Sequence, residues 1–282
     1  MLTWLEKRRP LRKTVESKEI RTVRNLLMAG SASAAMILFE KPAIDFFTKF
    51  VEDRRIGFLK IFKLPHSIET ILAIILLDYT LYLWHVSTHK VPFLWRFFFV
   101  FPLGFFFVSL TPPRFFFCEK NIFLFFGGFV FVWNFSPAFR FHFGKIIFSV
   151  LGRIMQFLRM GASPQAVKIW QTLLFPAVLF HHSNLKLPDD WDEKLSQIII
   201  TPRLHGIHHS VVQAETDSNW STILSVWDRL HRTLKTDVNQ TEIKIGVPAF
   251  QNSQELKFIY LLELPFLEQK PSWQISDDKE NN

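Results

Sequence analysis

The chain has 282 residues, which is enough for one large or two small domains. Hydrophobic residues make up 49% of it and phenylalanine alone occupies 33 positions, a composition too apolar for an ordinary soluble domain. The net charge of +8 comes from basic residues in the amino-terminal tail and beside apolar runs, not from one stripe with spaced aromatic residues. This pattern argues against a nucleic-acid partner and fits the positive-inside rule of membrane proteins. The single cysteine, Cys118, excludes an internal disulfide and a cysteine-based zinc site.

The amino-terminal region predicts a tail followed by a membrane anchor. Residues 1–24 are basic, and we expect a cytoplasmic tail with a short helix. Residues 25–39 are apolar but fall short of the roughly 20 residues that cross a bilayer, so an extension to Phe47 or a tilted helix is needed. The run Ser31–Ala35 is similar to a signal-peptide cleavage site. The long basic region before it and the very short apolar part favour a retained anchor instead.

Residues 42–65 mix apolar and charged side chains, as an interfacial amphipathic segment does. The clearest membrane span follows at Ile68–Trp84. Asp78 lies inside this span, where a charged residue is usually functional. We predict that it pairs with a histidine one or two turns later; packing between helices is the alternative.

A second pair of apolar segments covers Ile146–Met160 and Ala166–Leu179, with a turn between them. If the basic tail is cytoplasmic, each pair of spans goes out and returns, which brings the histidines after each pair to the cytoplasmic face. The more polar remainder predicts helices at about 190–200 and 219–234. We therefore expect an all-α integral membrane bundle with a cytoplasmic histidine-rich helical cap. Its parts are the tail 1–24, membrane helices 25–184, the cap 185–268 and a disordered tail 269–282.

Seven of the ten histidines lie in three short clusters, and imidazole is a good ligand for iron, zinc and copper. His85 and His89 are four residues apart, so both project from one helix face. The cluster at 205–209 combines spacings of three and four, again on one face. The alternative to metal binding is that histidines at a helix end form hydrogen bonds to water or lipid headgroups. Three clusters at one membrane face favour a shared metal site. A zinc-protease HExxH motif is excluded, because Val86 stands where that motif requires glutamate.

The order HxxxH, HHSN, TPRLHGIHHS, ETDSNWS and VWDRLHRT resembles the fatty acid hydroxylase and sterol desaturase superfamily. The resemblance covers about 68–96 and 140–250. It implies an integral membrane enzyme that holds two irons on the cytoplasmic side and uses dioxygen to hydroxylate or desaturate a fatty acyl or sterol-type lipid.

The resemblance also implies roles for individual residues. The implied metal ligands are His85, His89, His182, His205, His208 and His209. His181 and His142 are further candidates, with an interfacial position as the alternative for His142. Asn219 and Asp228 match positions that shape the last histidine motif rather than bind metal.

The chain departs from the family where a middle HxxHH motif is expected. Phe98, Phe101 and Pro102 stand at the three ligand positions, within a phenylalanine-rich stretch at 97–139. This stretch is either a frame-shifted or damaged segment, or a genuine insertion in which 97–110 and 121–135 form a hairpin. The resemblance implies two irons. The remaining histidines could serve one metal ion fully and two only poorly, so one iron or none are the alternatives for this chain.

The expected partners are a lipid substrate, a membrane and a separate electron donor, a reductase with a cytochrome or ferredoxin-type carrier. No GxGxxG motif is visible, so the chain has no recognisable nucleotide site of its own. The membrane is a bacterial inner membrane or the endoplasmic reticulum. Two alternatives stay open: a catalytically impaired member that keeps the fold and a partial metal site, and a structural protein without metal.

Overall fold

The computed structural model describes residues 2–12, 36–91 and 143–246, together with the single residues 30, 33, 34, 248, 260, 263 and 267. These residues form helices and loops, and their extended pairing is limited to three isolated β-bridges. The expectation of an all-α protein is therefore confirmed for the described chain. His142 and the stretch 97–139, with its hypothetical hairpin, lie outside the described residues.

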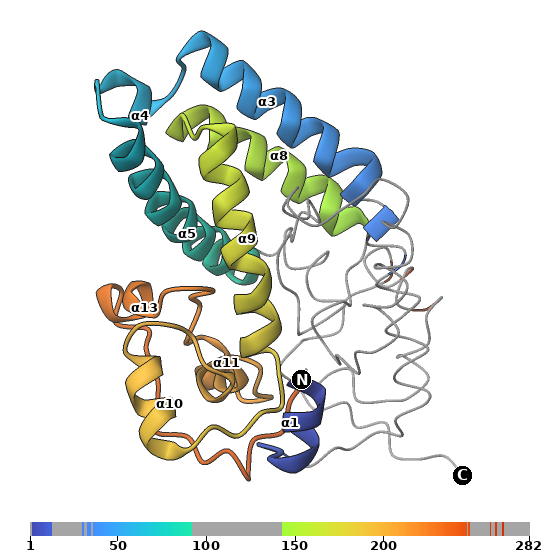
Figure 1. Cartoon of the computed structure of the whole chain (residues 1–282). Coiled ribbons are helices and arrows are strands. Elements are labelled where there is room, and N and C mark those ends of the chain that lie inside the picture. Colours follow the sequence, from blue (N-terminus) through green and yellow to red (C-terminus); the bar gives the residue numbers. More distant parts are fainter. Residues whose placement is uncertain are drawn as a thin grey trace.

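Four long helices form a bundle in the upper part of Figure 1. They are α3 (Lys41–Arg54), α5 (His66–Lys90), α8 (Phe143–Met160) and α9 (Pro164–His181). Helix α3 packs on α8, and α5 packs on α9. A short π-helix, η1 (Met36–Glu40), leads directly into α3, and α4 (Phe58–Ile61) connects α3 to α5. The core between the helices is apolar and includes Leu77, Phe157 and Trp170.

The turn between α8 and α9 lies where the sequence predicted it, and its residues fit the geometry. Gly161 has φ +76°, a conformation that favours glycine. The Ser163 hydroxyl accepts a hydrogen bond from Ala166 N at 3.2 Å and caps α9, while Pro164 occupies the first turn. A Cβ on Gly57 would lie 2.2 Å from Gly161 N, so the two glycines let the α3–α4 and α8–α9 turns touch.

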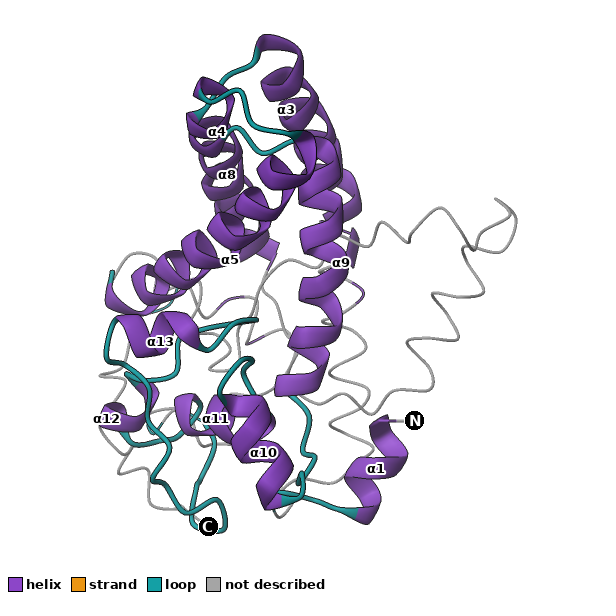
Figure 2. Cartoon of the chain, turned by 60° about the vertical axis from the view of Figure 1, so that its left-hand side comes forward, coloured by secondary structure: helices purple, strands orange, loops and turns teal. Residues whose placement is uncertain are grey.

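Residues 184–246, the distal region, cover the lower ends of α5 and α9 (Figures 1 and 2). The region contains α10 (Asp189–Ser196), α11 (Pro202–His208), α12 (Gln213–Thr216) and α13 (Val226–Leu230). The amino-terminal helix α1 (Leu2–Arg8) lies beside it, which agrees with the short helix expected in the tail.

The helix expected over 219–234 is wrong in extent, because the structure forms only α13 there. Asn219 has φ +52°, a left-handed conformation that no α-helix contains. The helix expected over 190–200 ends at Ser196, since Ile199 instead bridges to Leu224. Short extended contacts to a distant segment thus replace helical turns at both places.

Among the described residues, α5 is the one helix that is long and apolar enough to cross a membrane. It contains the span expected at Ile68–Trp84 and carries Asp78 in its interior. Helices α8 and α9 form the second apolar pair, as the sequence predicted, but neither meets the same test.

Candidate metal centre

The three histidine clusters meet at the junction between the bundle and the distal region. Helix α5 ends with His85 and His89, α9 ends with His181, and the short helix α11 carries His205 and His208. Because α5 and α9 pack side by side and end against α11, segments far apart in the sequence converge (Figure 1).

The first histidine group consists of His85, His89 and His208. One ring nitrogen from each lies within 4.8 Å of the others. The ring centroids of His85 and His208 are 4.7 Å apart, and those of His89 and His208 are 5.0 Å apart. His85 and His208 are buried and His89 is half-buried, so this group lies at the edge of the protein interior.

The second histidine group consists of His181, His182 and His205, all buried. Their ligand nitrogens also lie within 4.8 Å of one another. The Nε2 atoms of His182 and His205 are 3.1 Å apart, and Nε2 of His209 lies 2.9 Å from that of His205. Two nitrogens bound at right angles to one metal ion, each at about 2.1 Å, would be separated by about 3 Å. The spacing therefore suits a shared ion.

The two groups are adjacent, because α11 contributes to both. The rings of His205 and His208 lie 5.5 Å apart, with an angle of 23° between their planes. The sequence predicted that His205, His208 and His209 share a helix face. The structure adds that this face is divided: His208 joins the first group, while His205 and His209 face the second. The arrangement offers two neighbouring sites with imidazole donors.

Backbone carbonyls orient three of the rings. His85 Nδ1 donates to the Trp220 carbonyl at 2.6 Å, and His208 Nδ1 donates to the Ser218 carbonyl at 2.9 Å. His182 Nδ1 donates to the Val178 carbonyl at 2.9 Å. A carbonyl oxygen can only accept, so the proton of each neutral ring stays on Nδ1 and the lone pair is left on Nε2. This is the second hydrogen bond that metal-binding histidines usually make.

Burial keeps the rings of His205 and His208 neutral. It lowers the pKa of His208 to about 4, because the interior disfavours the imidazolium form. Burial, with His181 and His182 nearby, also lowers the pKa of His205 well below its ordinary value. Nε2 of His208 is buried and has no hydrogen-bond partner among the described residues. A neutral ring with an orphaned buried nitrogen fits a metal ion, and an all-imidazole donor set suits iron, zinc or copper.

The loop that supplies the carbonyls of Ser218 and Trp220 is held by Asn219 and Asp228. The Asn219 amide donates to the carbonyls of Leu204 and Lys235, at 2.9 and 2.8 Å. One oxygen of Asp228 accepts from Trp220 N at 2.8 Å and the other from Ser221 N at 2.9 Å. Burial raises the pKa of Asp228, and its hydrogen bonds oppose that shift. Neither residue belongs to a histidine group, so their contacts suit the shaping role that the resemblance implies.

Asp78 has a different neighbour from the one predicted. Its Oδ2 accepts from Leu224 N at 3.1 Å and from the Trp227 indole at 2.7 Å. These bonds tie the middle of α5 to the loop before α13 rather than to a histidine. Asp78 therefore helps to fix the distal region on the bundle.

Sequence reasoning missed Trp220 as part of the site. Its ring lies 4.8 to 5.3 Å from the rings of all three members of the first group, and its carbonyl orients His85. The available signal was its position next to Asn219, in the ETDSNWS motif.

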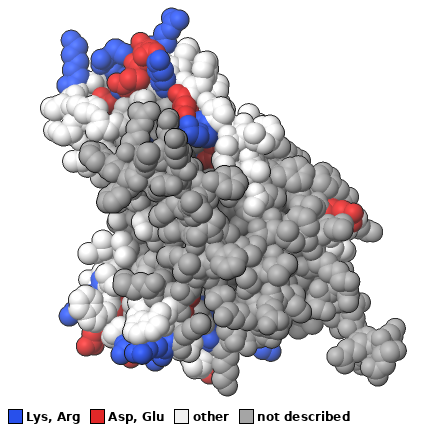
Figure 3. Space-filling model, turned by 45° about the vertical axis from the view of Figure 1, so that its right-hand side comes forward, with Lys and Arg blue, Asp and Glu red and all other residues white. Residues whose placement is uncertain are grey.

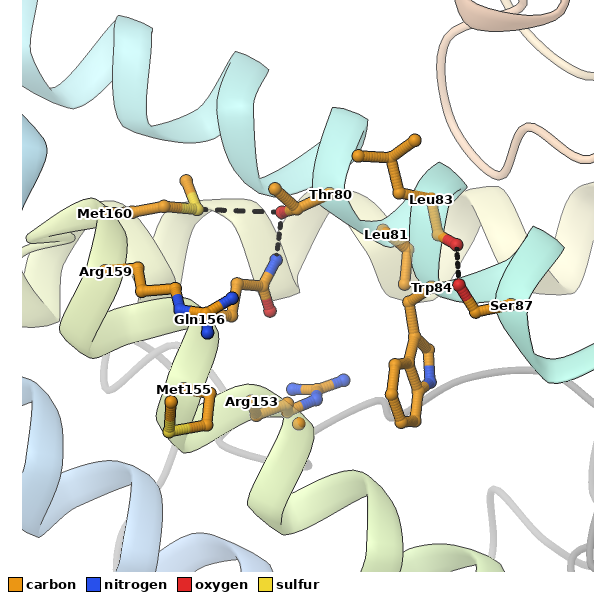
Figure 4. A pocket seen from close by; sticks show the side chains of 11 residues that line it. Thr80, Leu81, Leu83, Trp84, Ser87, Arg153, Met155, Gln156, Arg159 and Met160 are labelled. Carbon is orange, nitrogen blue, oxygen red and sulfur yellow. Dashed lines mark hydrogen bonds between the residues drawn. The ribbon is translucent and has the colours of Figure 1, made fainter. Parts of the chain in front are cut away.

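A pocket of about 430 Å³ lies between α5 and α8 (Figure 4). Apolar side chains line much of it, among them Leu81, Trp84 and Met155, with Arg159 at its edge. Gly152 belongs to the same wall, and its missing Cβ lets the Trp84 ring come close, since a Cβ there would be 3.2 Å from the indole. Leu81 and Trp84 precede His85 on α5, so the pocket and the first histidine group share one helix.

Comparisons with known proteins agree with this picture. Residues 131–233 match the family described as fatty acid hydroxylase, a region that contains the second and third histidine clusters. The chain is also similar to the ornithine lipid hydroxylase OlsE of Rhizobium tropici, at 26% identity over 215 residues. That alignment covers 76% of this chain and 53% of the relative, so the chain spans about half the length of the curated relative that it matches. No solved structure matches.

Proposed function

The chain belongs to the fatty acid hydroxylase superfamily, and from this premise we propose that it is a membrane-bound, metal-dependent oxygenase that hydroxylates a lipid. The observation that carries the proposal is the pair of adjacent histidine groups, each offering three ring nitrogens within 4.8 Å of one another. The name of the relative, an ornithine lipid hydroxylase, supports a lipid as the substrate class. Within this proposal, desaturation is the alternative reaction and a sterol-type lipid is the alternative substrate.

Two irons are the proposed cofactor. The first ion would be held by His85, His89 and His208, and the second by His181, His182 and His205, with His209 beside it. When bound, iron supplies the activation of dioxygen and the oxidation of a C–H bond. The chain itself orients His85, His182 and His208 through backbone carbonyls, and burial keeps the rings of His205 and His208 neutral.

The pocket between α5 and α8 is the proposed site for the lipid chain. Its volume of about 430 Å³ lies within the range of small-molecule sites, and its apolar wall suits an alkyl chain. Leu81 and Trp84 would position that chain on the helix that carries His85, and their side chains would exclude water from it. Figure 4 shows the open space between Trp84 and the α8 side chains.

The helical bundle is proposed to lie in a lipid bilayer. Helix α5 is 25 residues long, or about 37 Å, which is sufficient for a hydrocarbon core of about 30 Å. Many large apolar side chains on the bundle are exposed, a pattern that marks a lipid-facing surface. Examples are Phe39, Phe46, Phe50, Ile71, Ile75, Leu151, Met155 and Leu173. On the face drawn in Figure 3, charged side chains of described residues lie at the upper and lower ends, and one acidic side chain lies at the right-hand edge between them.

The amino-terminal segment supports the orientation. Residues 2–12 lie against the distal region, so this part of the basic tail and the histidine groups are on the same side of the bundle. By the positive-inside rule, that side is the cytoplasmic face of a bacterial inner membrane or the endoplasmic reticulum. Electrons would reach the centre there from a separate reductase with a cytochrome or ferredoxin-type carrier.

A catalytically impaired protein is the second candidate, and one observation favours it. Phe98, Phe101 and Pro102 stand where the family's middle histidine motif is expected. Under this alternative the fold persists and the histidine groups hold at most a partial metal site. Resequencing the gene across codons 97–139 tests the origin of the stretch, because recovery of a histidine motif would identify it as damaged.

The decisive experiment combines metal analysis with lipid analysis. The full chain is expressed with a reductase system, and its metal content and the host lipids are measured by mass spectrometry. We expect about two irons per chain and lipids that are heavier by one oxygen atom. A content of about one metal ion per chain, with no hydroxylated lipid, would favour the impaired protein. A purified chain without metal would contradict both the oxygenase and the impaired protein with a partial metal site.

Two variants on the same helix sharpen the experiment. His85→Ala removes a proposed ligand, whereas His66→Ala removes an exposed histidine at the other end of α5 that bonds to Gln165. We expect the first to lose metal and product and the second to keep both. Equal behaviour of the two variants would contradict the assignment of His85.

A further inference from the structure

The amino-terminal arm, residues 2–12, is bound to the chain beside the second histidine group. Pro10 forms an isolated β-bridge with Leu185. Lys186 N donates to the Arg9 carbonyl at 2.8 Å, and Leu11 N donates to the Asn184 carbonyl at 2.9 Å. The arm thus contacts a segment that begins two residues after His182, although more than 170 residues of chain separate them.

Asn184 holds the end of the arm with its side chain. Its Oδ1 accepts from Arg12 N at 2.9 Å, and its Nδ2 donates to the Arg12 carbonyl at 2.8 Å. Asn184 N also donates to Glu6 Oε1 at 2.7 Å. This two-way amide contact places the Arg12 backbone at one position and so directs where its side chain can go.

The Arg12 guanidinium reaches helix α11. Its Nη2 donates to the Pro202 carbonyl at 3.1 Å and to the Gln240 side chain. A Cβ on Gly206 would lie only 1.6 Å from this Nη2, so the guanidinium fills the space that any larger residue would need. Gly206 stands between His205 and His208, which belong to different histidine groups. Arg12 therefore touches the helix backbone midway between the two groups.

Helix α11 needs such external support. It has seven residues, no side chain caps its start, and it contains the poor helix former Gly206. Burial lowers the pKa of Arg12 to about 10, and no described carboxylate forms an ion pair with it. A partly buried cation that bonds to a carbonyl and an amide is costly to place, so its position depends on the docked arm.

We propose that Arg12 is a positioning residue of the metal centre: held by Asn184, it fixes helix α11 so that His205 and His208 face two different histidine groups. The inference goes beyond the proposed function, because it concerns the assembly of the centre and is the same for any lipid substrate. It predicts that the amino-terminal arm controls how firmly metal is held.

The first test measures local structure without requiring metal. Amide hydrogen exchange of residues 202–210 is followed in the full detergent-solubilised chain, in Arg12→Ala and in the control Arg9→Ala. Arg9 lies on the same arm with an exposed side chain and contributes only its carbonyl, so its replacement removes an equal charge. We expect faster exchange in Arg12→Ala and no change in Arg9→Ala. Unchanged exchange in Arg12→Ala would overturn the proposal.

The second test measures metal release to an excess of chelator. Partners that orient metal ligands typically affect affinity by about 10- to 100-fold. We expect Arg12→Ala to release metal on the order of tenfold faster, and Arg12→Lys to recover part of the loss, because an ammonium can still donate to the Pro202 carbonyl. If the wild type holds no metal, the proposed function fails while hydrogen exchange still decides the role of Arg12.

A double-variant cycle tests the contact itself. Gly206→Ala must expel the guanidinium, since the end of a flexible side chain is what occupies the Cβ position. We expect Gly206→Ala to resemble Arg12→Ala, and the double variant to be no worse than either single variant. Additive effects on hydrogen exchange would show that the two residues act separately, which contradicts the proposal.

Discussion

At the residue scale, the histidines show how the fold selects one nitrogen of a ring that offers two. The carbonyls of Trp220 and Ser218 accept from Nδ1 of His85 and His208, which leaves Nε2 for a ligand. Burial then disfavours protonation of His205 and His208, so these two rings stay neutral in solutions where an exposed histidine would be partly charged. Asp228 belongs to neither histidine group; it fixes the backbone of the loop that carries the two carbonyls.

Replacing Asp228 by Asn should therefore weaken both stability and metal retention. The carboxylate accepts from Trp220 N, Ser221 N and the Thr233 hydroxyl, whereas an amide turns a donor toward one of them. We expect a loss of about 2 kcal/mol in the free energy of unfolding, the scale of hydrogen bonds to a charged group. Thermal unfolding measures it, with the exposed Asp237→Asn as control. Equal melting temperatures for both variants would contradict the role given to Asp228.

The metal-free protein should lose stability as the pH falls from 7 to 5. Burial lowers the pKa of His208 to about 4 in the folded state, while the unfolded chain keeps an ordinary value near 6.5. Below pH 6.5 the unfolded state therefore binds more protons, and the free energy of unfolding falls with pH until the folded ring also titrates. Unfolding of the metal-free chain at both pH values measures the change. His208→Gln removes one such group and should show a smaller fall; an equal fall would reject this cause.

At the element scale, the ends of the helices decide where the histidines arrive. Helices α5 and α9 both end at the distal region, and the α8–α9 turn sets the starting point of α9 at the other end of the bundle. Because Gly161 and Gly57 lack side chains, the backbone of the α3–α4 turn can contact the backbone of the α8–α9 turn. The sequence predicted this turn correctly because its glycine, serine and proline carry their preferences locally. It overestimated the helices of the distal region because contacts with distant segments compete there.

Gly161→Ala should destabilise the bundle. The residue has φ +76°, and a Cβ would lie 2.8 Å from the Ile56 carbonyl oxygen, which cannot move without moving the α3–α4 turn. We expect a loss of about 1 to 3 kcal/mol, the usual range for a strained non-glycine residue. Gly30→Ala is the matched control, because nothing lies within 4 Å of its Cβ position. Denaturation midpoints that shift equally would show that the turn does not need glycine.

At the scale of the whole molecule, the histidine groups bring together the separate parts of the described chain. Helices α5, α9 and α11 each contribute histidines to these groups, the loop at 218–221 supplies carbonyls that orient two of the rings, and the amino-terminal arm contacts α11. Asp78 adds a further link between the bundle and the distal region. Metal bound between these parts would therefore stabilise the complete fold rather than one element.

Removing the metal should lower the melting temperature of the protein. A ligand that binds only the folded state adds about 2.7 kcal/mol when its concentration is one hundred times its dissociation constant. We expect a fall of several degrees after chelation, and recovery when iron(II) is added back. The same treatment of His85→Ala, which lacks one proposed ligand, should cause a smaller fall. A melting temperature that chelation leaves unchanged in the wild type would contradict a structural role for the ion.

The sequence by itself determined the helical class, the apolar span in α5, the α8–α9 turn and the histidine clusters, because periodicity, turn residues and ligand types are local properties. Only the tertiary structure decided that the last cluster is divided between two groups, that Asp78 bonds to Trp227, that Trp220 lies beside the first group, and that Arg12 contacts helix α11. These features depend on contacts between residues far apart in the chain. No local pattern encodes the angle at which helices cross or the partner that a buried polar group finds.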